Sequence, residues 1–286
     1  MPARRQPSVR ARQLAAEIRQ LREVRRLTGE EAAAALGWSP SKVSRIETAR
    51  SAVAVGDLRR LLDLYEAPRS RRDRLIELAR ASDQRGWWDA YSESLKEGYS
   101  AMIALEAVAE SVREYNPSLV PGLLQTEAYM EEIFRSSLYI DLPGVVTQRV
   151  EVRITRQAVL TREEDPLELI AILDEAVLHR QVGGPDVMRA QLRYLAQMSE
   201  RPNVTLQVLP FTSGSHPAMT GGFQIIRFPG ATESNVVYLE NRTSDIFVER
   251  EDEVSDYLLA FDRLRAMALE PHQSTALLIQ TADQTN

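Results

Sequence analysis

One stretch near the beginning of the chain constrains the fold more than any other, because helix starts and a tight turn follow one another there at fixed spacing. Thr28 and Glu31 have the spacing of a capping box, which opens a helix. Gly37 can adopt a left-handed backbone conformation without a Cβ clash, which ends that helix. Ser39 and Pro40 then supply an N-cap and a residue suited to the first helical position. The pattern predicts two short helices joined by a tight turn.

Small and apolar residues stand where these helices would cross and face a core. Ala33 is small enough for a close crossing, and Val43 and Ile46 are apolar at the spacing of one helical face. Apolar faces from Arg12 to Arg26 and from Val55 to Tyr65 predict flanking helices. We therefore expect an all-α N-terminal domain built as a helix-turn-helix, with a plain helical bundle as the alternative.

The second helix of a helix-turn-helix lies in the major groove of double-stranded DNA, where its exposed side chains meet base edges and phosphates. The predicted recognition helix is about Pro40–Glu47. Lys42 and Arg45 suit base edges or phosphates, the serines suit phosphate oxygens, and a solvated surface residue is the alternative for each. The predicted DNA-binding residues are Thr28, Ser39, Ser41, Lys42, Ser44, Arg45 and Arg50.

Two further groups of charged residues flank this motif. We expect Glu47 to be structural, holding a backbone amide or an arginine of the bundle. A basic arm precedes the first helix, and we expect it either to reach DNA or to be disordered. Its basic residues are Arg4, Arg5, Arg10 and Arg12.

Charge divides the chain into two unequal parts. Residues 1–80, the predicted helix-turn-helix domain, hold 18 arginine and lysine residues against 10 aspartate and glutamate residues, a net charge of +8. Residues 81–286 hold 17 against 31, a net charge of −14. The basic part suits a polyanion, whereas the acidic part suits a ligand, a protein partner or self-association. A helix from Arg71 to Ala81 is expected to connect the two.

Helix and strand patterns alternate over residues 85–286, which predicts a mixed α/β C-terminal domain and an α+β multidomain fold for the whole chain. Residues 86–105 read as aromatic and irregular. The expected strands cover residues 168–173, 203–209, 222–228, 236–239 and 246–248. The expected helices cover residues 126–136, 145–160, 185–199, 251–268 and 273–282.

An aromatic cluster, Trp87, Trp88 and Tyr91, stands at the beginning of this domain. Aromatic rings bury much area at low entropic cost. The cluster is therefore expected to line an apolar pocket or a protein interface, or alternatively to seal the two domains together.

The signatures of the common enzyme classes are missing, so we expect a binding module with no catalytic residues, no metal and no cofactor. The histidines His179, His216 and His272 lack the spacing of metal ligands. The hydroxyl-rich loop from Phe211 to Pro217 reads as a surface turn or a ligand-covering loop rather than the seat of a nucleophile. Asp174, with its neighbour Glu175, reads as a solvated charge at a helix end.

Composition gives no reason to expect an oxidising compartment. There is no cysteine, so disulfides and thiolate metal sites are excluded. The N-terminus lacks the apolar core of a signal peptide, and no apolar run is long enough to span a membrane. We expect a cytoplasmic protein without a membrane partner.

The segment LTGEEAAAALGWSPSKVSRIETAR resembles the Cro and phage-repressor-like helix-turn-helix family, also called the xenobiotic-response-element (XRE) family. Gly29 departs from that family, which usually has a glutamine there that braces the DNA backbone. The phrases REYNPSLVPGLLQTEAYM, LDEAVLHRQVGGPDVMRAQLRYL, RPNVTLQVLPF and VVYLEN resemble regulators of the WhiJ type. That resemblance implies a DNA-binding regulator, often encoded beside a small acidic partner protein in a toxin-antitoxin-like pair.

These observations predict a sequence-specific transcriptional regulator. A single recognition helix reads only a few base pairs, so a homodimer on a two-fold operator is expected. The C-terminal domain would sense a partner protein or a small-molecule effector. The alternatives are an antitoxin that neutralises its small partner and autoregulates its operon, or a DNA-targeted enzyme.

Overall fold

In a computed structural model the chain forms two compact units, Met1–Asp89 and Ala90–Asn286. The boundary predicted between residues 80 and 85 lies outside the described residues, as do Arg4 and Arg5 of the basic arm. The structure describes residues 9–51, 53–69, 71–72, 75–76, 79, 87–91, 95–136, 144–229 and 235–285.

The N-terminal unit is helical, as predicted. Its helices are α1 (Val9–Val24), α2 (Gly29–Leu36), α3 (Pro40–Glu47) and α4 (Val55–Leu64). Apolar residues recur on one face of each helix and meet in a single core. The fully buried members of this core include Ile18, Leu58 and Leu61. The predicted helix Arg71–Ala81 lies largely outside the described residues.

The C-terminal unit is built on a six-stranded mixed sheet among the described residues, with the strand order β3-β2-β1-β4-β5-β6. Strands β1, β2 and β3 run parallel, and β4, β5 and β6 continue the sheet in antiparallel pairs. The strands are β1 (Ser111–Asn116), β2 (Glu168–Asp174), β3 (Val204–Leu209), β4 (Phe223–Arg227), β5 (Val236–Glu240) and β6 (Asp245–Val248).

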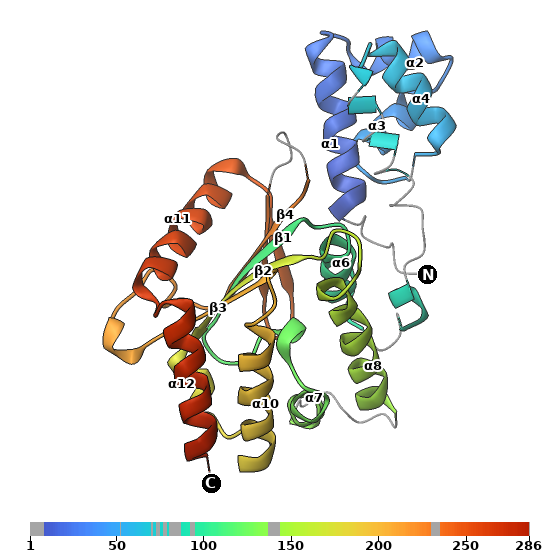
Figure 1. Ribbon diagram of the computed structural model, residues 1–286. Helices are drawn as coiled ribbons and strands as arrows, with labels where there is room; N and C mark the ends of the chain where they lie inside the picture. The colour runs from blue at the N-terminus through green and yellow to red at the C-terminus, as the bar shows by residue number, and fades with distance from the viewer. Residues whose placement is uncertain are drawn as a thin grey trace. The chain divides into compact units, whose positions relative to one another are not determined.

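Helices cover both faces of this sheet (Figure 1). The helix α11 packs on the face that carries Tyr115, Ile225 and Val237. The opposite face carries Glu114, which lies near Arg156 of α8. The helices are α6 (Glu97–Glu106), α7 (Glu127–Arg135), α8 (Val145–Gln157), α9 (Glu175–His179), α10 (Pro185–Met198), α11 (Glu251–Met267) and α12 (Pro271–Gln284). Short 3-10 turns are η1 (Trp87–Tyr91), η2 (Gly122–Leu124), η3 (Ala158–Leu160) and η4 (Phe211–Ser213).

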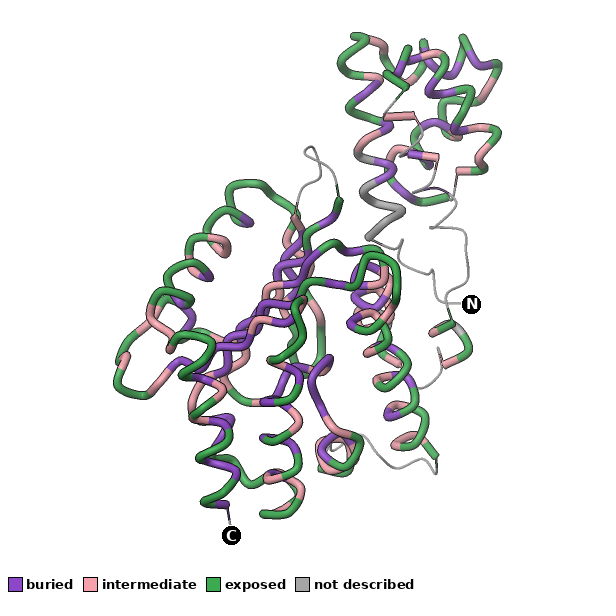
Figure 2. The backbone as a smooth tube through the Cα atoms, viewed as in Figure 1, coloured by how far each residue is buried: buried purple, intermediate pink, exposed green. Residues whose placement is uncertain are grey.

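The central strands are the most deeply buried part of the unit (Figure 2). In β2, five consecutive residues from Leu169 to Leu173 are buried, which is the continuous apolar pattern of a parallel strand covered on both faces. This pattern explains why β2 was predictable from its sequence as a short apolar run.

The expectation that residues 86–105 are irregular is wrong for their second half, because α6 begins at Glu97. The strand β1, which lies at the centre of the sheet, was not predicted from the sequence. Charged residues interrupt the apolar alternation that would mark β1 as a strand, and one of them, Glu114, is buried. The strands and helices predicted beyond residue 126 are confirmed. No helix in the described part of the chain combines the length and apolarity needed to cross a bilayer.

Candidate nucleic-acid interface

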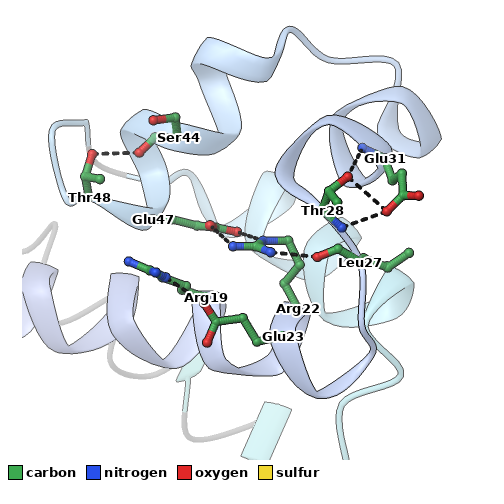
Figure 3. A network of polar contacts seen from close by, with 9 residues as sticks. All are labelled: Arg19, Arg22, Glu23, Leu27, Thr28, Glu31, Ser44, Glu47 and Thr48. Carbon is green, nitrogen blue, oxygen red and sulfur yellow. Dashed lines mark hydrogen bonds and ion pairs between the residues drawn. The ribbon is translucent and has the colours of Figure 1, made fainter.

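The turn between α2 and α3 follows the capping chemistry that the sequence predicts. The backbone N–H of Glu31 donates to Thr28 Oγ1 at 3.2 Å, and the Thr28 N–H donates to Glu31 Oε2 at 2.7 Å (Figure 3). Gly37 has φ 68°, and its N–H caps the last carbonyls of α2. A residue with a Cβ is strained at this angle, so glycine fixes the path from α2 into α3.

The start of α3 is capped by Ser39, whose Oγ accepts from the N–H of Lys42 at 3.3 Å. Pro40 occupies the first turn, where its missing N–H costs no helical hydrogen bond. Val43 and Ile46 are buried, as predicted. Their burial leaves the opposite face of α3 to solvent, which is the arrangement a recognition helix needs.

A partly buried ion pair holds α3 against α1. Arg22 donates from Nε and Nη2 to the two carboxylate oxygens of Glu47 at 2.8 and 2.9 Å, and its Nη1 donates to the Leu27 carbonyl at 2.6 Å (Figure 3). The side chains are 13% and 7% exposed. The hydrogen bonds to Glu47 raise the pKa of Arg22. Glu47 is therefore structural, as the sequence analysis predicted, and the partner it selects is an arginine.

The exposed face of α3 carries Ser41, Ser44 and Arg45. Ser41 lies beside Ser39, with their hydroxyl oxygens 3.1 Å apart. Arg45 makes no ion pair or side-chain hydrogen bond to any described residue, so its guanidinium is available to a partner. Arg50, three residues beyond the end of α3, is likewise exposed and without a side-chain partner in the described part of the chain. Five N–H donors make each arginine suited to a phosphate or to guanine.

Two of the predicted DNA-binding residues have partners inside the unit. Lys42 Nζ forms an ion pair with Asp57 of α4 at 2.7 Å and lies 3.9 Å from the centroid of the Trp38 ring. Thr28 donates its hydroxyl to Glu31 within the capping box. Asp57 engages one of the three N–H donors of the Lys42 ammonium group, whereas Arg45 has no such carboxylate partner among the described residues. Sequence reasoning missed Asp57 and Trp38, although Trp38 stands four residues before Lys42.

The rest of the predicted interface is partly described. Arg10 and Arg12 belong to the backbone of α1, and their side chains lie outside the described residues. The aromatic cluster falls in η1, where the Trp87 and Trp88 rings meet edge to face with centroids 5.7 Å apart. Trp87 is 37% exposed.

Side chains that commonly bind metal ions do not gather in the part of the chain that the structure describes. No cluster of three or more histidine, cysteine, aspartate or glutamate side chains is arranged there to hold a metal ion. The residues of the N-terminal site are hydroxyl and cationic donors, which bind anionic oxygens and base edges.

Comparison with protein families supports both units. A model described as "Helix-turn-helix domain" matches residues 13–75, which begin inside α1 and extend beyond the end of α4. A model described as "Domain of unknown function (DUF5753)" matches residues 99–280, more than half of the chain. No curated protein and no solved structure matches the chain significantly. The chain thus has a helix-turn-helix domain at its N-terminus and belongs to the DUF5753 family.

Proposed function

We propose that the chain is a sequence-specific transcriptional regulator of the Cro and phage-repressor-like class, in which α3 lies in the major groove of double-stranded DNA. The observation that carries this proposal is the way α3 is fixed in the unit. Its first turn is capped, its inner face is apolar, and Glu47 forms an ion pair with Arg22 of α1. A helix fixed in this way presents its outer side chains at a defined register, which base readout requires.

The roles of the exposed residues follow from their chemistry. Arg45 reads a base edge, because an exposed guanidinium with no partner among the described residues suits the O6 and N7 acceptors of guanine. Ser41 and Ser44 donate to phosphate oxygens at either side. Arg50 follows the helix and neutralises a backbone phosphate. Lys42 contributes positive charge and the N–H donors that Asp57 leaves unused.

A homodimer on a two-fold operator is part of the proposal, because one helix contacts too few base pairs to select a site in a genome. The C-terminal unit acts as a binding module that senses a ligand or protein and adjusts DNA affinity, and it has no catalytic role. Neutralisation of a small acidic partner protein stays a prediction from the WhiJ-type resemblance.

The test is binding of the full chain to a duplex from its own promoter, compared with a scrambled duplex, across a salt series. Arg45→Ala is expected to weaken promoter binding by about tenfold to a hundredfold and to reduce the discrimination between the duplexes. Arg50→Ala is expected to weaken both duplexes alike and to lower the salt slope by about one.

Arg135→Ala is the matched control, since it removes an exposed arginine of α7 in the other unit and is expected to change neither quantity. Equal affinity of the unaltered protein for promoter and scrambled DNA would contradict sequence-specific binding. An unchanged affinity of Arg45→Ala would contradict the assignment of α3.

A further inference from the structure

A second polar site lies in the C-terminal unit, at the carboxyl ends of the parallel strands. Tyr115 stands near the end of β1, and Asp174 and Leu209 end β2 and β3, where they are paired across the two strands. Ligands of open sheets with parallel strands commonly bind outside the carboxyl ends of these strands. A cavity of about 290 Å³ opens at this edge, near the lower limit of ordinary ligand pockets.

Three polar side chains meet in the wall of this cavity. The Tyr115 hydroxyl donates to Asp174 Oδ2 at 3.3 Å, and His216 Nε2 lies 3.4 Å from the same hydroxyl. Burial, with the Asp174 carboxylate beside it, raises the pKa of Tyr115, so the phenol keeps its proton. Because that proton is given to Asp174, the phenol oxygen accepts from His216 Nε2–H.

This chain of hydrogen bonds fixes what the site offers to a ligand. Asp174 Oδ1 also accepts the N–H of Ala176 at 2.9 Å, which leaves lone pairs on both carboxylate oxygens. Nδ1 of His216 is buried and has no partner among the described residues, a state that calls for an explanation. In the neutral tautomer that has Nε2 as its donor, Nδ1 is an acceptor. The sequence reading of Asp174 as a solvated charge is therefore incomplete, since the side chain is half-buried and bound to Tyr115.

The charge of the cavity selects against anions. The described residues that line it include Asp174 but no lysine or arginine. An anionic ligand would face the carboxylate without a compensating cation, whereas a cation would neutralise it. Residues 81–286 carry a net charge of −14, which also favours a cation over an anion.

The remaining walls are apolar and extend to the rim. Leu209 and Ala218 are buried in the wall, while Phe211 and Met219 are 59% and 68% exposed. The loop that carries Phe211 is anchored at both sides, because the Phe211 N–H donates to Glu175 Oε2 at 2.7 Å and Ser213 Oγ donates to the Met267 carbonyl at 3.0 Å. Large exposed apolar side chains on an anchored loop at a cavity rim suit an apolar ligand body.

We propose that this cavity binds a small organic cation, an ammonium or guanidinium group on an apolar body, with Asp174 as its charge partner. Tyr115 and His216 orient the carboxylate, and Phe211 and Met219 cover the apolar part. Binding of the cation to the cavity does not depend on the proposed function. Its consequence, that the cation acts as an effector of DNA binding, rests on that function.

The test uses two probes of matched shape and opposite charge, 4-fluorophenethylamine and 3-(4-fluorophenyl)propanoate. Fluorine NMR line broadening is measured with the full chain. The amine is expected to bind with a dissociation constant on the order of 1 mM, as suits a fragment of its size, and the propanoate is expected not to bind. Equal broadening of the two probes, or no broadening of the amine, overturns the proposal.

Variants assign the binding to this cavity. Asp174→Asn keeps an N-cap residue for α9 but removes the charge, and it is expected to weaken the amine by about tenfold or more. Met219→Lys places a cation at the exposed rim without altering the core and is expected to weaken the amine as well. Asp186→Asn, at a carboxylate that is 95% exposed at the start of α10, is the matched control and is expected to have no effect.

A parallel measurement of promoter binding separates this proposal from the regulatory one. Specific DNA binding with no amine binding overturns the cavity assignment alone. Amine binding that depends on Asp174, in a protein with no DNA preference, supports the cavity assignment and contradicts the proposed function.

Discussion

Each unit joins distant helices through a bidentate arginine–glutamate pair, and the two pairs differ in what surrounds them. In the N-terminal unit, Arg22 and Glu47 remain 13% and 7% exposed and lie at the edge of an apolar core. In the C-terminal unit, Arg156 and Glu106 are 3% and 1% exposed, with both bonds at 2.6 Å. Polar groups sit beside the core in the first unit and within the interior of the second.

The environment of the second pair is itself polar. Arg156 donates to the Tyr99 hydroxyl at 3.1 Å, and Glu114 of β1 lies near the same guanidinium. Glu114 Oε2, Gln224 Oε1 and the Tyr238 hydroxyl are buried without partners among the described residues. In the strand register, Glu114 of β1 lies opposite Gln224 of β4, and Gln224 lies opposite Tyr238 of β5. These residues therefore form a polar row across three neighbouring strands of the sheet.

The comparison predicts that the buried pair is the more sensitive of the two. Arg156→Met is expected to cost about 3 to 5 kcal/mol of unfolding free energy, because it leaves Glu106 charged and buried. Arg22→Met is expected to cost about 1 to 3 kcal/mol, since water can reach Glu47. Urea unfolding of the two variants measures the difference.

The double variant Glu106→Gln with Arg156→Met serves as the control for the charge. It is expected to be more stable than Arg156→Met alone, because no uncompensated charge remains. Losses of equal size for Arg156→Met and Arg22→Met would remove the distinction between the two pairs.

A second consequence concerns pH, because burial raises the pKa of Glu114 to about 7, against the pull of Arg156. The folded state then holds a proton that the unfolded chain releases near pH 4.5, so this group lowers stability as pH rises between these values. The change in unfolding free energy caused by Glu114→Gln is expected to be more stabilising at pH 8 than at pH 5, by about 2 kcal/mol.

Denaturant unfolding of Glu114→Gln and of the unaltered protein at both pH values checks this prediction. Subtracting the two free energies of unfolding at each pH removes the contribution of the other titrating groups. The partly exposed Glu131 of α7, changed to glutamine, removes a carboxylate outside this buried environment and provides the control. A stability difference that does not change with pH would show that Glu114 is ionised in the folded protein throughout.

The smallest effect concerns the turn of the first unit. Gly37→Ala is expected to cost about 1 kcal/mol, since φ is 68° and only the backbone conformation, not a clash, opposes the new Cβ. Gly29→Ala, where an added Cβ also meets nothing within 4 Å, is expected to be neutral or stabilising by up to about 1 kcal/mol. Thermal unfolding distinguishes them, and equal shifts would contradict the role of Gly37 in the turn.

The same contrast explains what could be predicted from the sequence. The helices α2 and α3 follow from local chemistry, namely a capping box, a left-handed glycine and a Ser-Pro start. The strand β1 could not be predicted in this way, because Glu114 and Arg113 interrupt any apolar alternation. Its burial depends on tertiary partners such as Arg156, which no local pattern reveals.

The candidate DNA-binding site was predictable in part. The exposed face of α3 and the structural role of Glu47 followed from helical spacing. The ion pair between Lys42 and Asp57 did not, because it joins α3 to α4 across the bundle. The cavity at Asp174 was also hidden, since Tyr115, Asp174 and His216 lie far apart in the sequence and meet only when the parallel strands align.

The measurement that tests the central claim most directly places a single cysteine on the outer face of α3. The chain has no cysteine, so Ser44→Cys creates one reactive thiol. Ser255→Cys, at an exposed position of α11, creates the control. The rate of alkylation is measured with and without promoter DNA. The proposal predicts that DNA protects the thiol at position 44 and leaves the thiol at position 255 unchanged. Equal alkylation at position 44 while DNA is bound would contradict the placement of α3 in the major groove.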